Sequence, residues 1–127
     1  MEFTALVTLL LISQYLVFAM LVGRERLRHG IMAPACSGHP QFDRAYRVHL
    51  NTMEQLLVVL PAMWVVAVFF VYPVVGPLLG LLFFFGRILF RNAYMRDPAQ
   101  RRAGMALGLI AQLGLLACGF WSVLLRL

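Results

Sequence analysis

Long runs of apolar residues, separated by short polar segments, organise this chain. The runs cover residues 3–22, 42–72, 77–95 and 102–125. Each is long enough, as a helix that rises about 1.5 Å per residue, to cross a hydrocarbon core about 30 Å thick. We therefore expect an all-α integral membrane protein, a bundle of four transmembrane helices that forms a single domain over residues 1–127.

The composition agrees with this pattern. Apolar residues make up 62% of the chain, against about 45–50% in typical soluble domains. We expect the first apolar run to remain in the protein as a membrane span, because it lacks the basic leading segment of a cleaved signal peptide.

The polar segments between the runs differ in charge. Arginines cluster between residues 23 and 41 and again between residues 96 and 102, whereas the turn around Pro73 has none. Cytoplasmic loops of membrane proteins are enriched in positive charge. We therefore expect both basic segments, and any site that they help to build, to lie at the cytoplasmic face.

Arginine is the only basic residue type apart from histidine: the chain has 11 arginines, no lysine and 5 acidic residues. A guanidinium binds a carboxylate or phosphate with two parallel hydrogen bonds and always keeps its charge. No basic stripe with interleaved aromatic residues lies on a polar segment, so nucleic acid is not an expected partner. Cys36 and His39 supply too few ligands for a metal site. Cys36 and Cys118 are expected at different depths, which argues against a disulfide.

Polar stripes interrupt two of the apolar runs. Arg47, Asn51 and Glu54 follow one another at spacings of four and three, so they share one face of a helix. Arg87 and Tyr94 lie seven residues apart on one face of the third run. A charge at the centre of a bilayer costs about 3 kcal/mol. We therefore expect the two stripes to face each other or a wet cavity.

Each polar residue also has a simpler interpretation. Arg47 would extend toward the lipid headgroups, and Tyr94 would belong to the aromatic belt at the membrane surface. Glu54 and Arg87 would form a buried ion pair that serves only stability. The two adjacent arginines near residue 101 would be ordinary loop residues. The convergence of all these groups on one face of the membrane favours a binding site instead.

The chemistry of these groups indicates the kind of ligand. Several guanidiniums, one carboxylate, an amide and a phenol suit a small zwitterion with more than one carboxylate and an ammonium group. Glutathione has this character, and its thiol becomes more nucleophilic when a nearby arginine lowers the thiol pKa. The membrane would deliver a lipophilic electrophile to the same place.

Three segments resemble a known family. Residues 42–54, with the sequence FDRAYRVHLNTME, resemble the second-helix signature of the MAPEG family, the membrane-associated proteins in eicosanoid and glutathione metabolism. Residues 87–102 are similar to the family's third helix and following loop, and residues 30–34 to its first loop. The resemblance spans nearly the whole chain. It implies a homotrimer that binds glutathione as co-substrate between neighbouring subunits, near the cytosolic face.

The resemblance also implies roles for individual residues. Arg47, Asn51, Glu54 and Tyr94 would bind glutathione, and Arg26 in the first basic segment would reach one of its carboxylates.

The family's thiol-activating arginine lies seven residues after its tyrosine, which here is Arg101. Arg102 is adjacent and about 100° around a helix, so only one of the two can point at the sulfur. We prefer Arg101, and the choice stays open. Arg87 completes the expected glutathione-binding set. Two tyrosines of the family pattern are replaced here, by Gln55 and Phe90.

These observations predict a membrane-bound glutathione transferase with its active site near the cytoplasmic face of a bacterial inner membrane. Glutathione peroxidase activity toward lipid hydroperoxides is a second expectation. One alternative is a non-catalytic, lipid-binding member of the same family, which would need no thiol-activating arginine. Another is a small four-helix multidrug transporter, whose essential acid would lie in the first span, where this chain has no acidic residue after Glu2 until Glu25.

Overall fold

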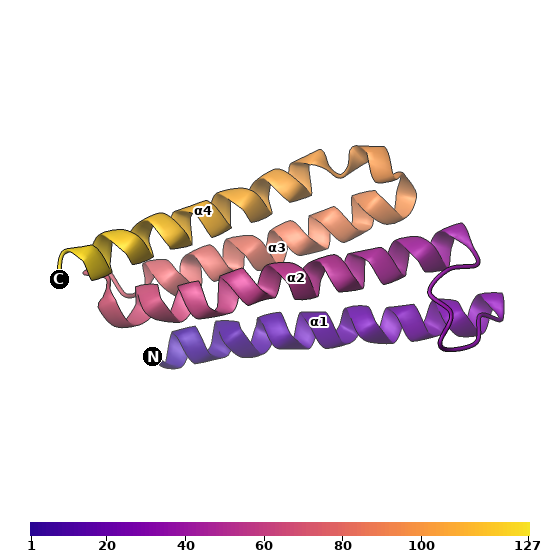
Figure 1. Cartoon of the computed structure of the whole chain (residues 1–127), viewed down its shortest axis with the longest axis horizontal. Coiled ribbons are helices and arrows are strands. Elements are labelled where there is room, and N and C mark those ends of the chain that lie inside the picture. The colour runs from indigo at the N-terminus through magenta and orange to yellow at the C-terminus, as the bar shows by residue number, and fades with distance from the viewer.

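The computed structural model describes residues 1–127 and contains no strands. Four long helices, α1 (Glu2–His29), α2 (Pro40–Phe69), α3 (Val75–Arg96) and α4 (Arg102–Leu124), lie alongside one another as an elongated bundle (Figure 1). A short 3-10 helix, η1 (Pro98–Gln100), precedes α4. Each long helix is apolar enough to cross a membrane. The predicted all-α membrane fold with four spans is therefore confirmed.

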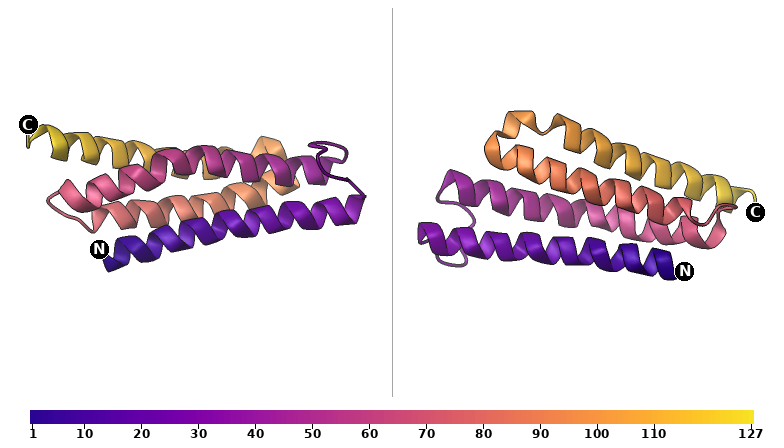
Figure 2. Two further views of the ribbon diagram at one scale, coloured as in Figure 1. Left: turned by 60° about the horizontal axis from the view of Figure 1, so that its bottom comes forward. Right: turned by 180° about the vertical axis from the view of Figure 1, so that it is seen from behind.

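The connections between helices alternate between the two ends of the bundle. Residues 30–39 and 97–101 lie at one end, which we call the basic end, and both termini lie at the other end (Figures 1 and 2). The short turn between α2 and α3 also lies at the end that carries the termini (Figure 1). The two arginine-rich segments thus share one end of the molecule, although more than fifty residues of chain separate them.

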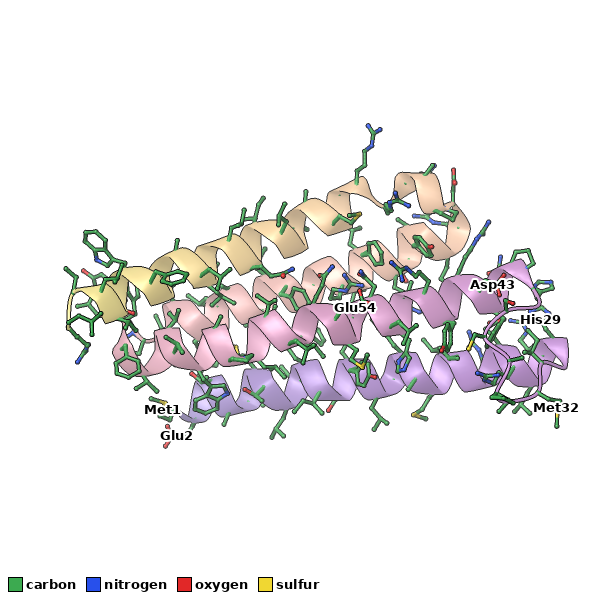
Figure 3. All side chains as sticks on the ribbon, viewed as in Figure 1. Met1, Glu2, His29, Met32, Asp43 and Glu54 are labelled. Carbon is green, nitrogen blue, oxygen red and sulfur yellow. The ribbon has the colours of Figure 1, made fainter.

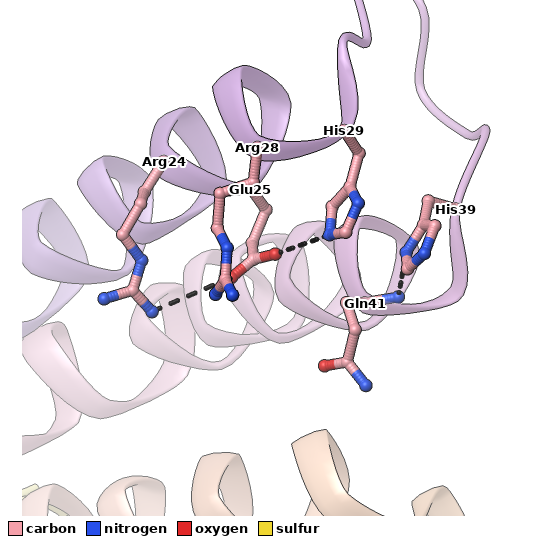
Figure 4. Close-up of polar contacts among 6 residues, drawn as sticks. All are labelled: Arg24, Glu25, Arg28, His29, His39 and Gln41. Atoms are coloured by element: carbon pink, nitrogen blue, oxygen red, sulfur yellow. Dashed lines mark hydrogen bonds and ion pairs between the residues drawn. The ribbon is translucent and has the colours of Figure 1, made fainter.

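The first helix is longer than the apolar run predicts. An end near residue 22 is wrong, because α1 continues to His29. The buried carboxylate of Glu25 lies 3.6 Å from Arg28 and 3.1 Å from His29, at the spacings of three and four residues that stabilise a helix (Figure 4). Gly30 then ends the helix with φ 63°, a left-handed conformation that favours glycine. Arg26 therefore lies on a helix rather than in a loop.

The start of α2 has a clear cause in the sequence. The ring of His39 accepts a hydrogen bond from the backbone N–H of Gln41, and Pro40 occupies the first turn, where its missing N–H costs nothing. His39 also stacks on His29 of α1, with ring centroids 3.5 Å apart (Figure 4). These contacts connect the ends of α1 and α2 at the basic end.

The apolar core lies along the middle of the bundle. All four helices contribute fully buried side chains to it, which are Val7, Leu11, Val59, Met63, Val66, Phe83, Ala111 and Leu115. The faces that point outward are also apolar, as expected for helices whose outer surface meets lipid.

Glycines set the closest approach between helices. A Cβ atom at Gly104 of α4 would lie 2.5 Å from the backbone of Phe90 in α3. A Cβ atom at Gly76 of α3 would lie 2.7 Å from the carbonyl oxygen of Met63 in α2. Glycine at these two positions therefore allows close helix packing within one chain.

Candidate functional site

A polar cleft opens near the basic end, between α2, α3 and α4. It has a volume of about 220 Å³. Its lining residues are Arg47 and Asn51 from α2, Phe90 and Tyr94 from α3, Arg101 immediately before α4, and Met105 in the first turn of α4. The structure thus brings together four of the predicted site residues from segments far apart in the sequence.

The cleft carries positive charge and no acidic side chain. Arg47 and Arg101 are both exposed, so their guanidiniums are free to meet a ligand. Tyr94 is half-buried, and its ring stacks on Phe90 with centroids 5.4 Å apart. The first turn of α4, which begins just after Arg101, has no side-chain cap, and its free N–H groups add positive potential. The arrangement suits an anionic ligand.

Arg87 lies beneath this cleft and does not line it. Its side chain is 0% exposed. It donates hydrogen bonds from Nη1 to Gln55 Oε1 and from Nη2 to Thr52 Oγ1, both at 3.1 Å. The guanidinium carbon also lies 4.3 Å from the ring centroid of Phe90, which separates it from the cleft. Arg87 therefore adds positive charge near the cleft from behind the Phe90 ring, and it is not among the residues that line the cleft.

A chain of amides connects Arg87 to the cleft. Gln55 Oε1 accepts from Arg87 and also from Gln112 Nε2, at 3.2 Å. Gln55 Nε2 donates to Oδ1 of Asn51, at 3.1 Å, and Asn51 lines the cleft. Sequence reasoning missed Gln112, and it treated Gln55 only as a departure from the family pattern. The available signal was that Gln112 is the one polar side chain in the middle of an otherwise apolar run.

Glu54 does not pair with Arg87. Its side chain is exposed, and no cationic group of the chain lies within ion-pair distance of it. It lies about halfway along α2 (Figure 3). Adjacent positions differ by about 100° around a helix, so Glu54 points elsewhere when Gln55 faces α3. The interpretation of Glu54 and Arg87 as a buried ion pair is therefore wrong, and so is the expectation that both turn inward.

Two more of the predicted residues lie outside the cleft. Arg26 of α1 donates to the carbonyl oxygen of Ala35 at 2.7 Å and lies over the ring of Phe42, so it supports the loop that precedes α2. Arg102 is exposed and does not line the cleft, whereas its neighbour Arg101 does.

A second cleft, of about 200 Å³, lies between α2 and α4 on the apolar part of the bundle. It is lined by Ala62, Val65, Leu115, Leu116, Gly119, Phe120 and Val123. It has no polar group that could orient a ligand, so the chemistry of the chain is concentrated at the basic end.

The fold and the cleft together define a small integral membrane protein with an arginine-lined site at one end of a four-helix bundle. A sequence model of the MAPEG family matches residues 4–121. The chain belongs to the MAPEG family.

Individual relatives agree with this assignment. The chain is 37% identical over 123 residues to an uncharacterized protein of Synechocystis sp., which covers 97% of this chain and 89% of that protein. It is 32% identical over 114 residues to human microsomal glutathione S-transferase 2, covering 88% of this chain and 77% of the relative. It is 34% identical over 121 residues to leukotriene C4 synthase of Cavia porcellus, covering 89% and 80%.

Proposed function

We propose that this protein is a membrane-bound glutathione transferase that adds the glutathione thiolate to lipophilic electrophiles. The observation that carries the proposal is the cleft that joins Arg47, Asn51, Tyr94 and Arg101 without an acidic side chain. Relatives with about a third of their residues identical to this chain are named for glutathione transfer and for leukotriene C4 synthesis.

The residues of the cleft suggest a division of labour. Arg47 would hold a glutathione carboxylate in a two-pronged contact, and the Asn51 amide would bind a peptide group of the ligand. Arg101 would stabilise the thiolate, because a neighbouring cation favours the charged form of a thiol. The thiol proton leaves to water. The sulfur lone pair then forms the new carbon–sulfur bond, while the bond that breaks at the attacked carbon gives its electron pair to a leaving group or to an acceptor atom of the electrophile, which takes up a proton from water.

A lipophilic substrate would reach this thiolate along α4. Met105 forms the apolar wall of the cleft, and Leu109 and Leu113 follow it at spacings of four residues, all three exposed on one face of the helix. This face leads from the cleft into the span that crosses the membrane. The same thiolate would attack a lipid hydroperoxide and break its O–O bond, which releases the lipid alcohol and oxidises the glutathione sulfur to a sulfenic acid. A second glutathione would then reduce the sulfenic acid to give glutathione disulfide and water, so peroxidase activity is part of the proposal.

We also propose that the chain assembles as a homotrimer with the sites at the cytoplasmic face. Glu54 and Arg26 both lie outside the cleft of their own chain. They would contribute to a glutathione site only where two copies meet, as the resemblance implies for the family. Glutathione bound between subunits would then meet groups from both.

The two alternative functions are less favoured. A non-catalytic scaffold needs no exposed arginine beside a binding cleft, yet Arg101 has that position. A multidrug transporter needs a free acid in the first span. There, the buried side chain of Gln14 donates to the carbonyl oxygen of Phe84, and Glu25 is surrounded by Arg24, Arg28 and His29.

The proposal predicts thiolate formation on the protein. Glutathione added to the purified protein near neutral pH should give the ultraviolet difference spectrum of a thiolate. Arg101→Ala should reduce this signal by at least about tenfold, equivalent to about 1.4 kcal/mol of lost charge stabilisation. Arg102→Ala is the matched control, because it removes the adjacent arginine that does not line the cleft.

The outcomes separate the mechanism from the residue assignment. No thiolate on the parent protein would contradict the transferase mechanism. Loss of the signal only in Arg102→Ala would keep the mechanism and transfer the activating role to Arg102.

A further inference from the structure

The side chain of Gln55 is held by contacts from three helices. Its oxygen accepts hydrogen bonds from Arg87 of α3 and Gln112 of α4, and its NH2 group donates to Asn51, one turn earlier on α2. We propose that Gln55 is a positioning residue that makes Asn51 present its NH2 group, and not its oxygen, to the ligand in the cleft. The inference deepens the proposed glutathione function and, in its bearing on ligand choice, rests on it.

The orientation of Gln55 follows from the chemistry of its neighbours. A guanidinium has five N–H donors and no acceptor. The Gln55 atom 3.1 Å from Arg87 Nη1 must therefore be the oxygen. Gln112 agrees with this assignment, because its Nε2 donates both to Gln55 Oε1 and to the carbonyl oxygen of Gly108. If the Gln55 amide were turned over, its NH2 group would face the N–H donors of Arg87 and Gln112, and both hydrogen bonds would be lost.

The orientation of Asn51 follows in turn. Since the oxygen of Gln55 faces Arg87, its NH2 group faces Asn51. The Asn51 side chain must therefore accept this hydrogen bond through its own oxygen. The Asn51 Nδ2 atom makes no hydrogen bond within the chain, and it is not among the side-chain polar atoms that are both buried and unpartnered. It is free to donate into the cleft that Asn51 lines.

The hydrogen bonds that run from Arg87 through Gln55 to Asn51, which we call the relay, determine which ligand group Asn51 binds. An NH2 group recognises an acceptor, so Asn51 would bind a carbonyl or carboxylate oxygen of the ligand rather than one of its N–H groups. For glutathione, the matching group is a peptide carbonyl. The relay depends on the glutamine at position 55, where the family pattern has a tyrosine. A tyrosine hydroxyl has a single polar atom, so it could not accept from Arg87 at one atom and donate to Asn51 from another.

The test uses the small number of asparagines in the chain. Asn51 and Asn92 are the only two, so protein labelled with ¹⁵N-asparagine gives two side-chain NH2 signals, and exposed Asn92 serves as an internal reference. In the parent protein, the Asn51 NH2 protons should exchange rapidly with water, and glutathione should shift their signals. An Asn51 NH2 group already protected from exchange without ligand would overturn the proposal.

Gln55→Glu should reverse the relay without removing the partner of Arg87. One carboxylate oxygen would still accept from Arg87 and Gln112, while the other would demand a donor from Asn51. The Asn51 amide should then turn over, so that its NH2 protons exchange about tenfold more slowly and the dissociation constant of glutathione rises about tenfold, as expected for loss of one hydrogen bond to the ligand. Gln41→Glu adds the same charge at the start of α2 and should leave both measurements unchanged.

The glutathione-binding measurement and the amide-exchange measurement test different parts of the inference. If the parent protein does not bind glutathione, the proposed function fails, and amide exchange in the parent and in Gln55→Glu still decides whether Gln55 orients Asn51. If glutathione binds but the Asn51 signals are the same in the parent and in Gln55→Glu, the relay is wrong and the proposed function stands.

Discussion

At the scale of single residues, the most unusual feature is a buried cation whose partners are all neutral. Arg87 is fully buried, and its hydrogen bonds go to an amide oxygen and a hydroxyl oxygen. Buried charges are normally paired with an opposite charge, because removing an ion from water is costly. The ring of Phe90 offers partial compensation through its π face. The remaining positive charge lies directly below the cleft and would strengthen the binding of an anion there.

Glu54 permits a clean test at this scale. Its side chain is exposed and unpaired within the chain, so Glu54→Gln should change the free energy of unfolding by no more than about 0.5 kcal/mol. If Glu54 binds the ammonium group of glutathione across a subunit interface, the same variant should weaken binding several-fold. Thermal unfolding in detergent and equilibrium dialysis with glutathione would check the two parts.

Two results with Glu54→Gln would contradict these expectations. Unchanged affinity would remove Glu54 from the glutathione site, whereas a large loss of stability would mean that it has a structural partner in the assembled protein.

At the scale of elements, the contact between α3 and α4 determines the shape of the site. Gly104 lets α4 approach the backbone of Phe90. Two residues that line the cleft lie on either side of Gly104 in the chain: Arg101, just before α4, and Met105. Any side chain at position 104 must push the two helices apart. The position of the proposed thiol-activating group therefore depends on a residue that has no side chain.

Gly104→Ala tests this dependence. The added Cβ would meet the backbone of Phe90 at 2.5 Å, and overpacking of this kind typically costs about 1–3 kcal/mol. We expect a lower unfolding temperature and a weaker glutathione thiolate signal, because Arg101 moves away from the cleft.

Gly23→Ala is the matched control, since nothing lies within 4 Å of a Cβ at that position of α1. It should be neutral or stabilising by about 0.5–1 kcal/mol, the usual gain from alanine in a helix interior. Equal destabilisation by both variants would contradict the proposed role of the close contact.

At the scale of the whole molecule, the alternation of the four helices gathers both arginine-rich segments at one end. The loop of residues 30–39 and the turn of residues 97–101 both lie at this basic end (Figure 1). Arg101 of that turn lines the polar cleft. Because cytoplasmic loops are enriched in positive charge, we predict an orientation in the membrane that places the cleft on the cytoplasmic side.

Cys36 reports this orientation. It is exposed in the loop at the basic end, whereas Cys118 is half-buried in α4. A membrane-impermeant maleimide should modify the protein in inside-out vesicles and not in right-side-out ones. The variant Cys36→Ser should abolish the labelling of inside-out vesicles. Labelling of the parent protein in right-side-out vesicles instead would mean that the orientation is opposite to the one predicted.

Much of the fold could be predicted because a membrane restricts the choices. In lipid, a helix is the structure that satisfies every backbone hydrogen bond within a single segment, so four apolar runs of about 20 residues or more imply four helices. The prediction failed at the end of α1, where contacts of Glu25 with Arg28 and His29 extend the helix beyond the apolar run. Apolar length reports where a helix meets lipid, and it does not report where the helix ends in water.

The site was predicted less completely than the fold. Arg47 and Asn51 could be grouped from their spacing, because one turn of a helix places them together. Gln112 could not be connected to Gln55, since the two are 57 residues apart and meet only through the packing of α4 against α2.

The amino-acid sequence by itself determined the four spans, the shared basic end and the presence of polar groups that lipid would not tolerate. The tertiary structure alone decided that Arg101 and not Arg102 lines the cleft, that Glu54 faces outward, and that Arg87 is held from below by neutral partners. The physical reason is that the sequence does not specify how far each helix is rotated about its own axis. Periodicity shows which residues share a helix face, but the direction of that face is set by how the glycines and core side chains of neighbouring helices fit together.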